Sequence, residues 1–197
     1  MRQGISPLCW QTRGGAVYDE SPPAGTTERM QAPETHLFRD DGRFPNSNYP
    51  VLVYRGVLTE PSSARAVAFE RLFSSHAWPA AWRNGLYTQH HYHSTAHEVL
   101  GVYEGWVNAR LGGERGALVV LRAGDVVVIP AGVAHCNEGQ SKDFRAIGAY
   151  PRGTDMDMNY GEPRDRPRAD RNISAVPLPA QDPVYGANGP LIEIWQS

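Results

Sequence analysis

The sequence predicts an all-β chain folded as an antiparallel sandwich or barrel. From Gly85 onward, short apolar runs are separated by turns that contain glycine, and several short strands at this spacing are typical of such architectures. The chain holds 20 Gly and 16 Pro, which favour many turns over long helices. No helical pattern alternates with these runs, which argues against a parallel sheet with crossover helices.

Each expected strand is a short run with β-branched or aromatic residues. The runs are LYTQHHYH (86–93), EVLGVYEG (98–105), WVNARL (106–111), ALVVL (117–121), DVVVIP (125–130), AHCNE (134–138) and FRAIGAY (144–150). Upstream, YPVLVYRGVL (49–58) reads as a further strand. Residues 62–78 carry apolar side chains at helical spacing, so we expect one helix that Ser62 caps and that ends before Pro79.

The two ends of the chain differ in composition from its middle. Residues 1–30 are rich in Gly, Pro, Ser, Thr and charges, and we expect a flexible N-terminal extension there. Residues 31–197 are expected to form a single domain. Its tail, 161–197, is polar and proline-rich, and we expect it to be irregular. The tail ends in GPLIEIW (189–195), and such an apolar end is expected to pack on the barrel or on a partner chain.

Charge and cysteine content narrow the class of protein. The net charge of −2 over 197 residues gives no electrostatic case for nucleic acid or for an anionic membrane. The two cysteines, Cys9 and Cys136, make no disulfide framework and fit a reducing compartment. The N-terminus lacks the apolar core of a signal peptide. We therefore expect a cytoplasmic protein that binds neither membrane nor nucleic acid.

Four of the seven histidines fall between His90 and His97, and Glu98 follows directly. Alternate residues of a strand share a face, so His91 and His93 should project together while His90 points away. The segment STA then forms a turn, after which Glu98 can close on the same ion. His97 becomes an alternative ligand if this turn slips by one residue.

A further histidine, His135, follows the turn PAG (130–132) after a buried strand. Three imidazoles and one carboxylate would occupy four positions around a metal ion. An octahedral ion would keep two open positions for water, O₂ or substrate.

Two motifs carry a family resemblance. Gly85 to Gly105 reads G-x5-H-x-H-x4-E-x6-G, and Gly124 to His135 reads G-x5-P-x-G-x2-H. Together they resemble the two motifs of the cupin superfamily, and the flanking text looks like that of the YjlB-like small cupins. The resemblance implies a jelly-roll barrel, or double-stranded β-helix, with a metal near its centre. It implies as ligands His91, His93, Glu98 and His135. One departure is that Gly139 stands where the family often has asparagine.

The same alternation suggests substrate contacts. Tyr87 and Gln89 share parity with the predicted ligands, and Asn137 shares parity with His135, so these three should face the interior. Arg145 would be an anion clamp if it faced inward, and a surface position is its other interpretation. Cys136 has the opposite parity and should pack. The Asp- and Met-rich segment 150–163 is expected to be a structural loop near the barrel mouth, since no EF-hand spacing follows.

The preferred hypothesis is a mononuclear metal enzyme that acts on a small organic molecule, most simply by O₂-dependent, dioxygenase-like oxidation. Fe(II) is favoured, and Mn(II), Ni(II), Cu(II) or Zn(II) suits the same donors. Glu98 would also act as a base. The alternatives are non-redox isomerisation, decarboxylation or hydrolysis, and a non-catalytic module that binds a metal or metabolite. We expect a homodimer that uses the apolar C-terminus and the N-terminal strand.

Overall fold

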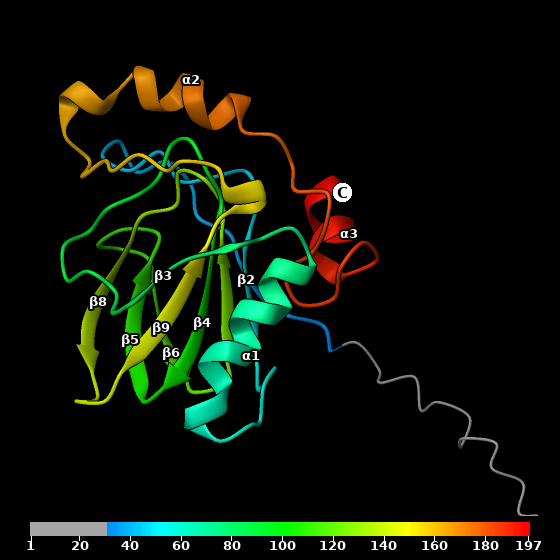
Figure 1. Ribbon diagram of the computed structural model, residues 1–197. Helices are drawn as coiled ribbons and strands as arrows, with labels where there is room; N and C mark the ends of the chain where they lie inside the picture. Colours follow the sequence, from blue (N-terminus) through cyan, green and yellow to red (C-terminus); the bar gives the residue numbers. More distant parts are fainter. Residues whose placement is uncertain (1–30) are drawn as a thin grey trace, which may run out of the picture.

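In this computed structural model, which describes residues 31–197, two antiparallel sheets enclose a barrel (Figure 1). The extension predicted for residues 1–30 lies outside the described residues. The strands are β1 (Glu34–His36), β2 (Val51–Tyr54), β3 (Ala80–Asn84), β4 (Glu98–Glu104), β5 (Trp106–Leu111), β6 (Ala117–Arg122), β7 (Val126–Ile129), β8 (His135–Gln140) and β9 (Arg145–Ala149). The helices are α1 (Ser62–Ser75), α2 (Arg168–Ala175) and α3 (Pro190–Gln196), with single 3₁₀ turns η1 (Pro151–Gly153) and η2 (Pro163–Asp165).

One sheet has six strands in the order β1-β2-β7-β4-β9-β3, and the other has three in the order β6-β5-β8. Every pairing between named strands is antiparallel, and the predicted all-β barrel is confirmed. Strands that are distant in the sequence lie side by side, as β2 and β7 do. This order brings β4 between β7 and β9, so a residue at the start of β4 lies near the end of β9.

The central strands of the six-stranded sheet, β2, β7, β4 and β9, are buried on both faces, whereas the edge strands β1 and β3 are largely exposed. On β4, Leu100 and Val102 belong to the cluster that fills the barrel, whereas Val99 packs in a second cluster outside it. The alternation of side chains along a strand produces this division. Glu98 shares parity with Leu100 and Val102, and so faces the barrel interior. The three-stranded sheet has one wet face, since Leu118 and Val120 of β6 are exposed.

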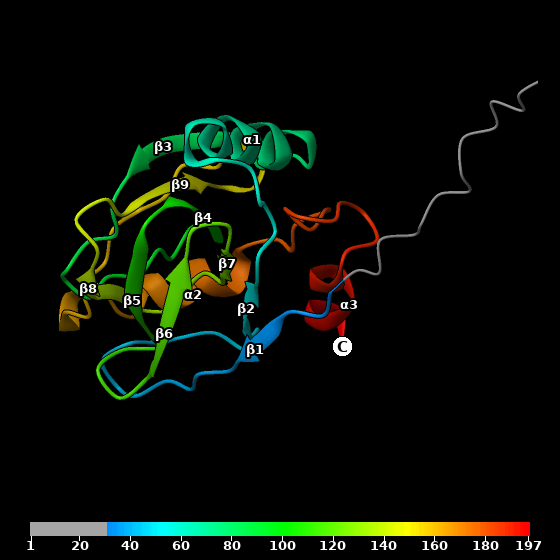
Figure 2. The same cartoon turned by 90° about the horizontal axis from the view of Figure 1, so that it is seen from below.

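Helix α1 covers the outer face of the six-stranded sheet and packs on β3, β4 and β9 (Figure 2). Phe69 and Phe73 of α1 are fully buried, and burying each ring stabilises the fold by about 1.5–3 kcal/mol. Gly101 of β4 lets the helix approach, because a Cβ there would lie 2.9 Å from the Phe69 ring. The C-terminal helix α3 completes this second cluster with Leu191 and Trp195.

The structure differs from the sequence expectations at several elements. Residues 86–93 form no regular strand, and only His91 and Tyr92 make isolated bridges, to His135 and Asn159. Strand β3 was not expected, and the C-terminal tail carries the short helices α2 and α3 rather than being wholly irregular. Ser62 is the first residue of α1 and makes no capping bond, because Pro61 occupies the cap position.

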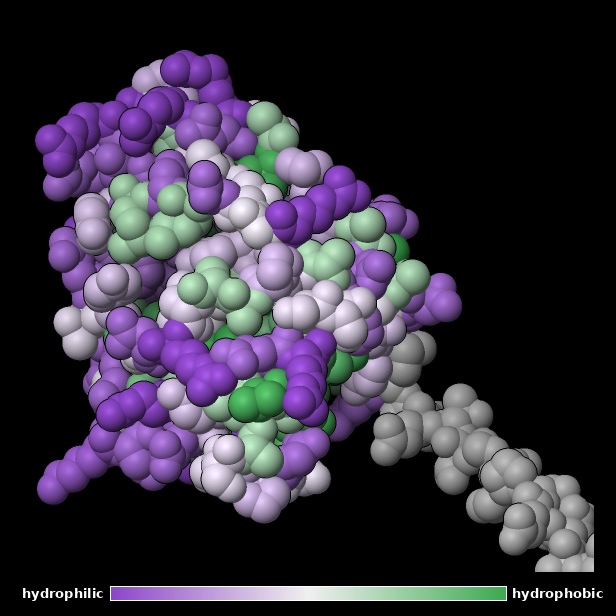
Figure 3. Space-filling model, viewed as in Figure 1, coloured by the Kyte–Doolittle hydropathy of each residue, from purple (hydrophilic) through white to green (hydrophobic). Residues whose placement is uncertain are grey.

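Helix α2 crosses one end of the barrel, and the surface over it is strongly hydrophilic (Figure 3). Within residues 31–197, the longest helix is α1 with 14 residues, and none of the helices has the length and apolarity needed to cross a membrane.

Candidate metal centre

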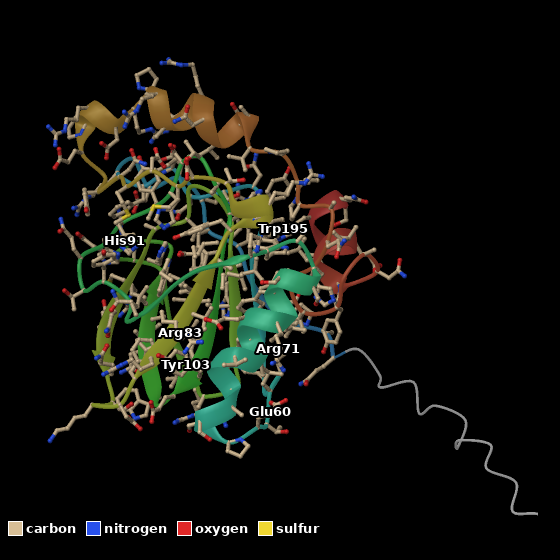
Figure 4. All side chains as sticks on the ribbon, in the orientation of Figure 1. Glu60, Arg71, Arg83, His91, Tyr103 and Trp195 are labelled. Atoms are coloured by element: carbon tan, nitrogen blue, oxygen red, sulfur yellow. The ribbon has the colours of Figure 1, made fainter. Side chains whose placement is uncertain are left out.

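Three buried histidines converge inside the barrel. His91 and His135 form an antiparallel bridge, with N–H to O=C bonds of 3.1 and 2.9 Å between their backbones. His93 follows two residues after His91, and one ring nitrogen from each histidine lies within 4.8 Å of the others. We call His91, His93 and His135 the inner cluster. Figure 4 places His91 at the end of the barrel nearer α2.

Each ring of the inner cluster is held through its Nδ1 atom by a backbone carbonyl. His91 Nδ1 lies 3.0 Å from the carbonyl of Gln89, and His135 Nδ1 lies 3.0 Å from that of Val133. His93 Nδ1 lies 2.6 Å from the carbonyl of Asp157. A carbonyl only accepts, so each Nδ1 must carry a proton, and in the neutral imidazole Nε2 is then the ring nitrogen that can bind a metal. This arrangement orients imidazoles as metal ligands.

Glu98, the first residue of β4, completes the group. Its Oε2 lies 3.3 Å from His135 Nε2 and 3.5 Å from His93 Nε2, and its side chain is buried. Within the described residues, His135 Nε2 is buried with no hydrogen-bond partner, since the neutral ring has its proton on Nδ1 and the nearby carboxylate can only accept. A buried polar atom of this kind calls for an explanation. The four predicted donors fit a divalent metal ion, because an ion would satisfy this atom.

The other oxygen of Glu98 is held by groups that the sequence patterns did not single out. Tyr150, directly after β9, donates its hydroxyl to Glu98 Oε1 at 2.9 Å. Trp82 of β3 in turn donates its indole N–H to the Tyr150 oxygen at 3.1 Å. Tyr150 could have been found by parity, since Ala146, Gly148 and Tyr150 alternate along FRAIGAY. Trp82 could not, because AAWRN lacks the pattern of a strand.

Burial and charge set the protonation of the site. Burial by itself would raise the pKa of Glu98, but the neighbouring imidazoles of His93 and His135 hold it below its usual value. Burial acts to lower the pKa of His93, yet the Glu98 carboxylate outweighs it and the pKa is raised. Burial, reinforced by His135, lowers the pKa of His91 to about 3. At neutral pH, Glu98 is therefore ionised and His91 is neutral. Both of these states favour the binding of a cation.

Asp157 organises the turn between His93 and Glu98. Its carboxylate accepts the backbone N–H of Ser94 at 2.6 Å, the Ser94 hydroxyl at 2.5 Å and the Asn159 amide at 2.9 Å. The same residue supplies the carbonyl that holds His93. The predicted structural role of the segment 150–163 agrees with these contacts, and Asp157 joins no group of metal-ligating atoms among residues 31–197.

The remaining histidines lie apart from the inner cluster. His97, the predicted alternative ligand, accepts the Ala131 N–H at Nδ1 (3.0 Å), and its ring packs against Trp195 at 4.8 Å between centroids. His90 points to the other face of the bridge, as its parity predicts, and its Nε2 lies 3.5 Å from Cys136 Sγ. His36 stacks on Phe38. Burial lowers the pKa of the His97 imidazole to about 4.

The four predicted substrate contacts are placed differently from one another. Tyr87 is 62% exposed but lines the cavity beside the inner cluster, with its ring edge-on to His91. Gln89 is exposed and contributes only its carbonyl, so its predicted inward orientation is wrong. Asn137 is buried, yet its side chain bonds to Leu86, Gln140 and Gly139 rather than lining that cavity. Arg145 is exposed, so it occupies a surface position and does not face the interior as an anion clamp. Parity failed at Gln89 because 86–90 is not a strand.

A cavity of about 220 Å³ opens onto His91 and His93 of the inner cluster and onto Glu98. Its lining residues are Trp82, Asn84, Gly85, Leu86, Tyr87, His91, His93, Glu98, Tyr150, Met156 and Met158. Ligand pockets more often measure about 300–1,000 Å³, so this space suits a small molecule. A larger cavity of about 710 Å³ borders His97 and shares no lining residue with the first.

Comparison with known proteins agrees with this architecture. The cupin family model matches residues 80–150, which include both motifs. Over 163 residues the chain is 42% identical to the uncharacterized protein YjlB of Bacillus subtilis (strain 168), covering 82% of this chain and 96% of that protein. The chain belongs to the cupin superfamily.

Solved structures with low sequence identity also match. RmlC from Streptococcus suis, solved in complex with dTDP-D-xylose, is 14% identical with a TM-score of 0.32, covering 82% of this chain and 94% of that one. Procruciferin, an 11S globulin from Brassica napus, is 17% identical with a TM-score of 0.34. The match covers 49% of this chain and spans only 30% of the globulin.

Proposed function

We propose that this protein is a mononuclear metal-dependent enzyme that acts on a small organic molecule. The observation that carries the proposal is the set of three buried imidazoles, each held by a backbone carbonyl, whose ring nitrogens lie within 4.8 Å of one another beside an ionised glutamate. The ligands would be His91, His93, Glu98 and His135. When bound, a divalent first-row ion supplies Lewis acidity and, in the case of Fe(II), which we favour, electrons for reaction with O₂.

The chain's own groups would bind and orient the substrate. Tyr150 fixes one oxygen of Glu98, so the carboxylate cannot rotate freely in the cavity. Trp82, Met156 and Met158 give the cavity apolar walls against which the carbon skeleton of a bound molecule would pack. Glu98 is ionised at neutral pH because its pKa is lowered, and it lines the cavity, so it is the group that would take a proton from the substrate.

The small cavity limits the substrate. A volume of about 220 Å³ corresponds to roughly seven water molecules at about 30 Å³ each. We propose an O₂-dependent oxidation of a compact molecule that carries vicinal oxygen atoms, such as a 1,2-diketone, a catechol or a 2-hydroxy acid. Such molecules chelate through two oxygens and fit four protein donors on an octahedral ion.

The metal content of untagged protein tests the site. We expect His135→Ala to lose one equivalent of metal that the wild-type protein holds, whereas His76→Ala keeps it, because His76 bonds to the Pro183 carbonyl at the end of α1. Equal metal content in all three proteins would refute the site.

Oxygen consumption tests the reaction. Protein loaded with Fe(II) is mixed with each of the three substrate classes, and an oxygen electrode follows the reaction beside product analysis. O₂ uptake that His135→Ala abolishes would support the oxidation. Turnover at an equal rate under anaerobic conditions would replace it with non-redox isomerisation, decarboxylation or hydrolysis. The homodimer stays a prediction, and a monomer mass by light scattering would contradict it.

A further inference from the structure

A second group of metal-ligating side chains lies on the other face of the bridge that joins His91 to His135. His90, Cys136 and Glu138 each bring one ligand atom, and these atoms lie within 4.8 Å of one another. We call them the outer cluster. The alternation of side chains explains the group, because the neighbours of His91 and His135 must face the opposite way. Glu138 shares the outward parity of Cys136 along β8.

The distance between the ligand atoms of His90 and Cys136 matches that in a metal site. His90 Nε2 and Cys136 Sγ are 3.5 Å apart. In a tetrahedral zinc site, Zn–S of about 2.3 Å and Zn–N of about 2.0–2.1 Å place the two ligand atoms about 3.6 Å apart. We propose that His90, Cys136 and Glu138 form a second metal site that binds Zn²⁺, with water in the fourth position.

The surroundings hold these donors in place and leave a path for an ion. The His90 ring packs against Phe44 at 5.6 Å between centroids, and Cys136 is only 2% exposed. Glu138 is exposed, so an ion can enter from solvent. His90 Nδ1 is buried and, within residues 31–197, has no hydrogen-bond partner, so no neighbour fixes the tautomer of the ring.

Arg110 already pairs with the carboxylate of Glu138. It donates to both oxygens of Glu138, at 3.0 and 2.7 Å. An ionised carboxylate has about four lone-pair sites, so Glu138 can keep Arg110 and still bind an ion. The ion would replace the thiol proton of Cys136, and that proton leaves to the buffer. A thiolate, an imidazole and a carboxylate together suit Zn²⁺ better than Mg²⁺ or Ca²⁺.

Cobalt absorption distinguishes the two sites. Co²⁺ bound to a thiolate shows a sulfur-to-metal charge-transfer band in the near ultraviolet, which the inner cluster cannot produce because it contains no cysteine. The titration uses the full chain with the substitution Cys9→Ser, in the presence of a phosphine reductant. Cys9 is the other thiol of the chain, so its removal leaves Cys136 as the single possible source of the band. We expect a band that saturates at one equivalent for this site and that Zn²⁺ removes by displacement.

Four further variants, all in the Cys9→Ser background, decide the assignment. Cys136→Ser should abolish the band, and His93→Ala should keep it while total metal falls by one equivalent. Glu138→Gln, at an exposed position that leaves folding intact, should weaken binding at least tenfold. The absence of a band in the Cys9→Ser protein, or a band with unchanged affinity in Glu138→Gln and His90→Ala, would overturn the proposal. Neither result bears on the inner cluster, whose metal is counted separately.

Discussion

The Tyr150 hydroxyl donates a 2.9 Å hydrogen bond to Oε1 of Glu98. Since the other oxygen lies 3.3 Å from His135 Nε2, this bond sets the rotation of the carboxylate. A partner of this kind typically changes metal affinity by about 10–100-fold. Tyr150→Phe should therefore weaken metal binding at least tenfold in a chelator competition. Tyr87→Phe is the matched control, and equal losses in both variants would contradict the assignment.

Gly148→Ala should disturb the same chain of bonds from a distance. A Cβ on Gly148 would lie 2.1 Å from the Trp82 indole, so the ring must move and its bond to Tyr150 is lost. We expect a loss of about 1–3 kcal/mol in the free energy of unfolding, typical of overpacking, together with weaker metal binding. Urea unfolding and chelator competition measure the two effects. Gly85→Ala is the control, since its backbone is not in the positive-φ region and a Cβ there would meet nothing closer than 3.9 Å. Unchanged metal affinity in Gly148→Ala would break the link to Glu98.

His97→Ala should lower stability without removing the metal. The substitution leaves the Ala131 N–H unpaired and opens a void against Trp195. These losses together amount to about 2–4 kcal/mol. Denaturant unfolding measures the cost, and metal analysis should still find the inner ion. A variant of unchanged stability that loses its metal would show His97 to be a ligand.

The metal-free protein should have its greatest stability near pH 6.5. His91 and His97 have folded pKa values lowered to about 3 and about 4, so below about pH 6.5 the unfolded chain takes up protons that the folded chain does not. Stability then falls as the pH drops, by at most about 1.4 kcal/mol per pH unit for each histidine. The raised pKa of His93 has the opposite sign, and its contribution is lost as the pH rises above about 6.5.

Urea unfolding in the presence of a chelator, at several values between pH 4.5 and pH 8, measures this profile. Glu98 does not enter the upper part of that range, because its pKa is lowered from an ordinary value near 4.5. His97→Leu should flatten the acid side of the profile. A free energy of unfolding that stays constant or rises from about pH 6.5 to about pH 4.5 would contradict the burial of neutral histidines.

The pattern of short strands and turns predicted an all-β sandwich or barrel, and the two motifs that resemble those of cupins predicted the gathering of the four donors. Strand alternation separated His90 from His91. Alternation then failed at Gln89, because the segment before His91 is held by long-range contacts instead of a ladder. The fit of Trp82 against Gly148 depends on the pairing of β3 with β9, which no local pattern encodes.

Helices α2 and α3 escaped prediction for a related reason. Both are short, and α3 is stabilised by burying Leu191 and Trp195 against strands far away in the chain. Asp157 likewise shows its role only once the loop reaches Ser94. The residues that surround the metal donors could therefore be identified only from the folded structure, whereas the donors themselves could be identified from the sequence.

The inner histidines are oriented by the carbonyls of Gln89, Val133 and Asp157, which belong to the backbone. A carbonyl is present whatever the side chain, so neutral drift at positions 89 and 133 cannot delete these acceptors. Position 157 is less free, because its carboxylate also ties down the turn. In related chains, the side chains around the donors can therefore diverge and adapt the cavity to new molecules, while the imidazole rings keep their orientation.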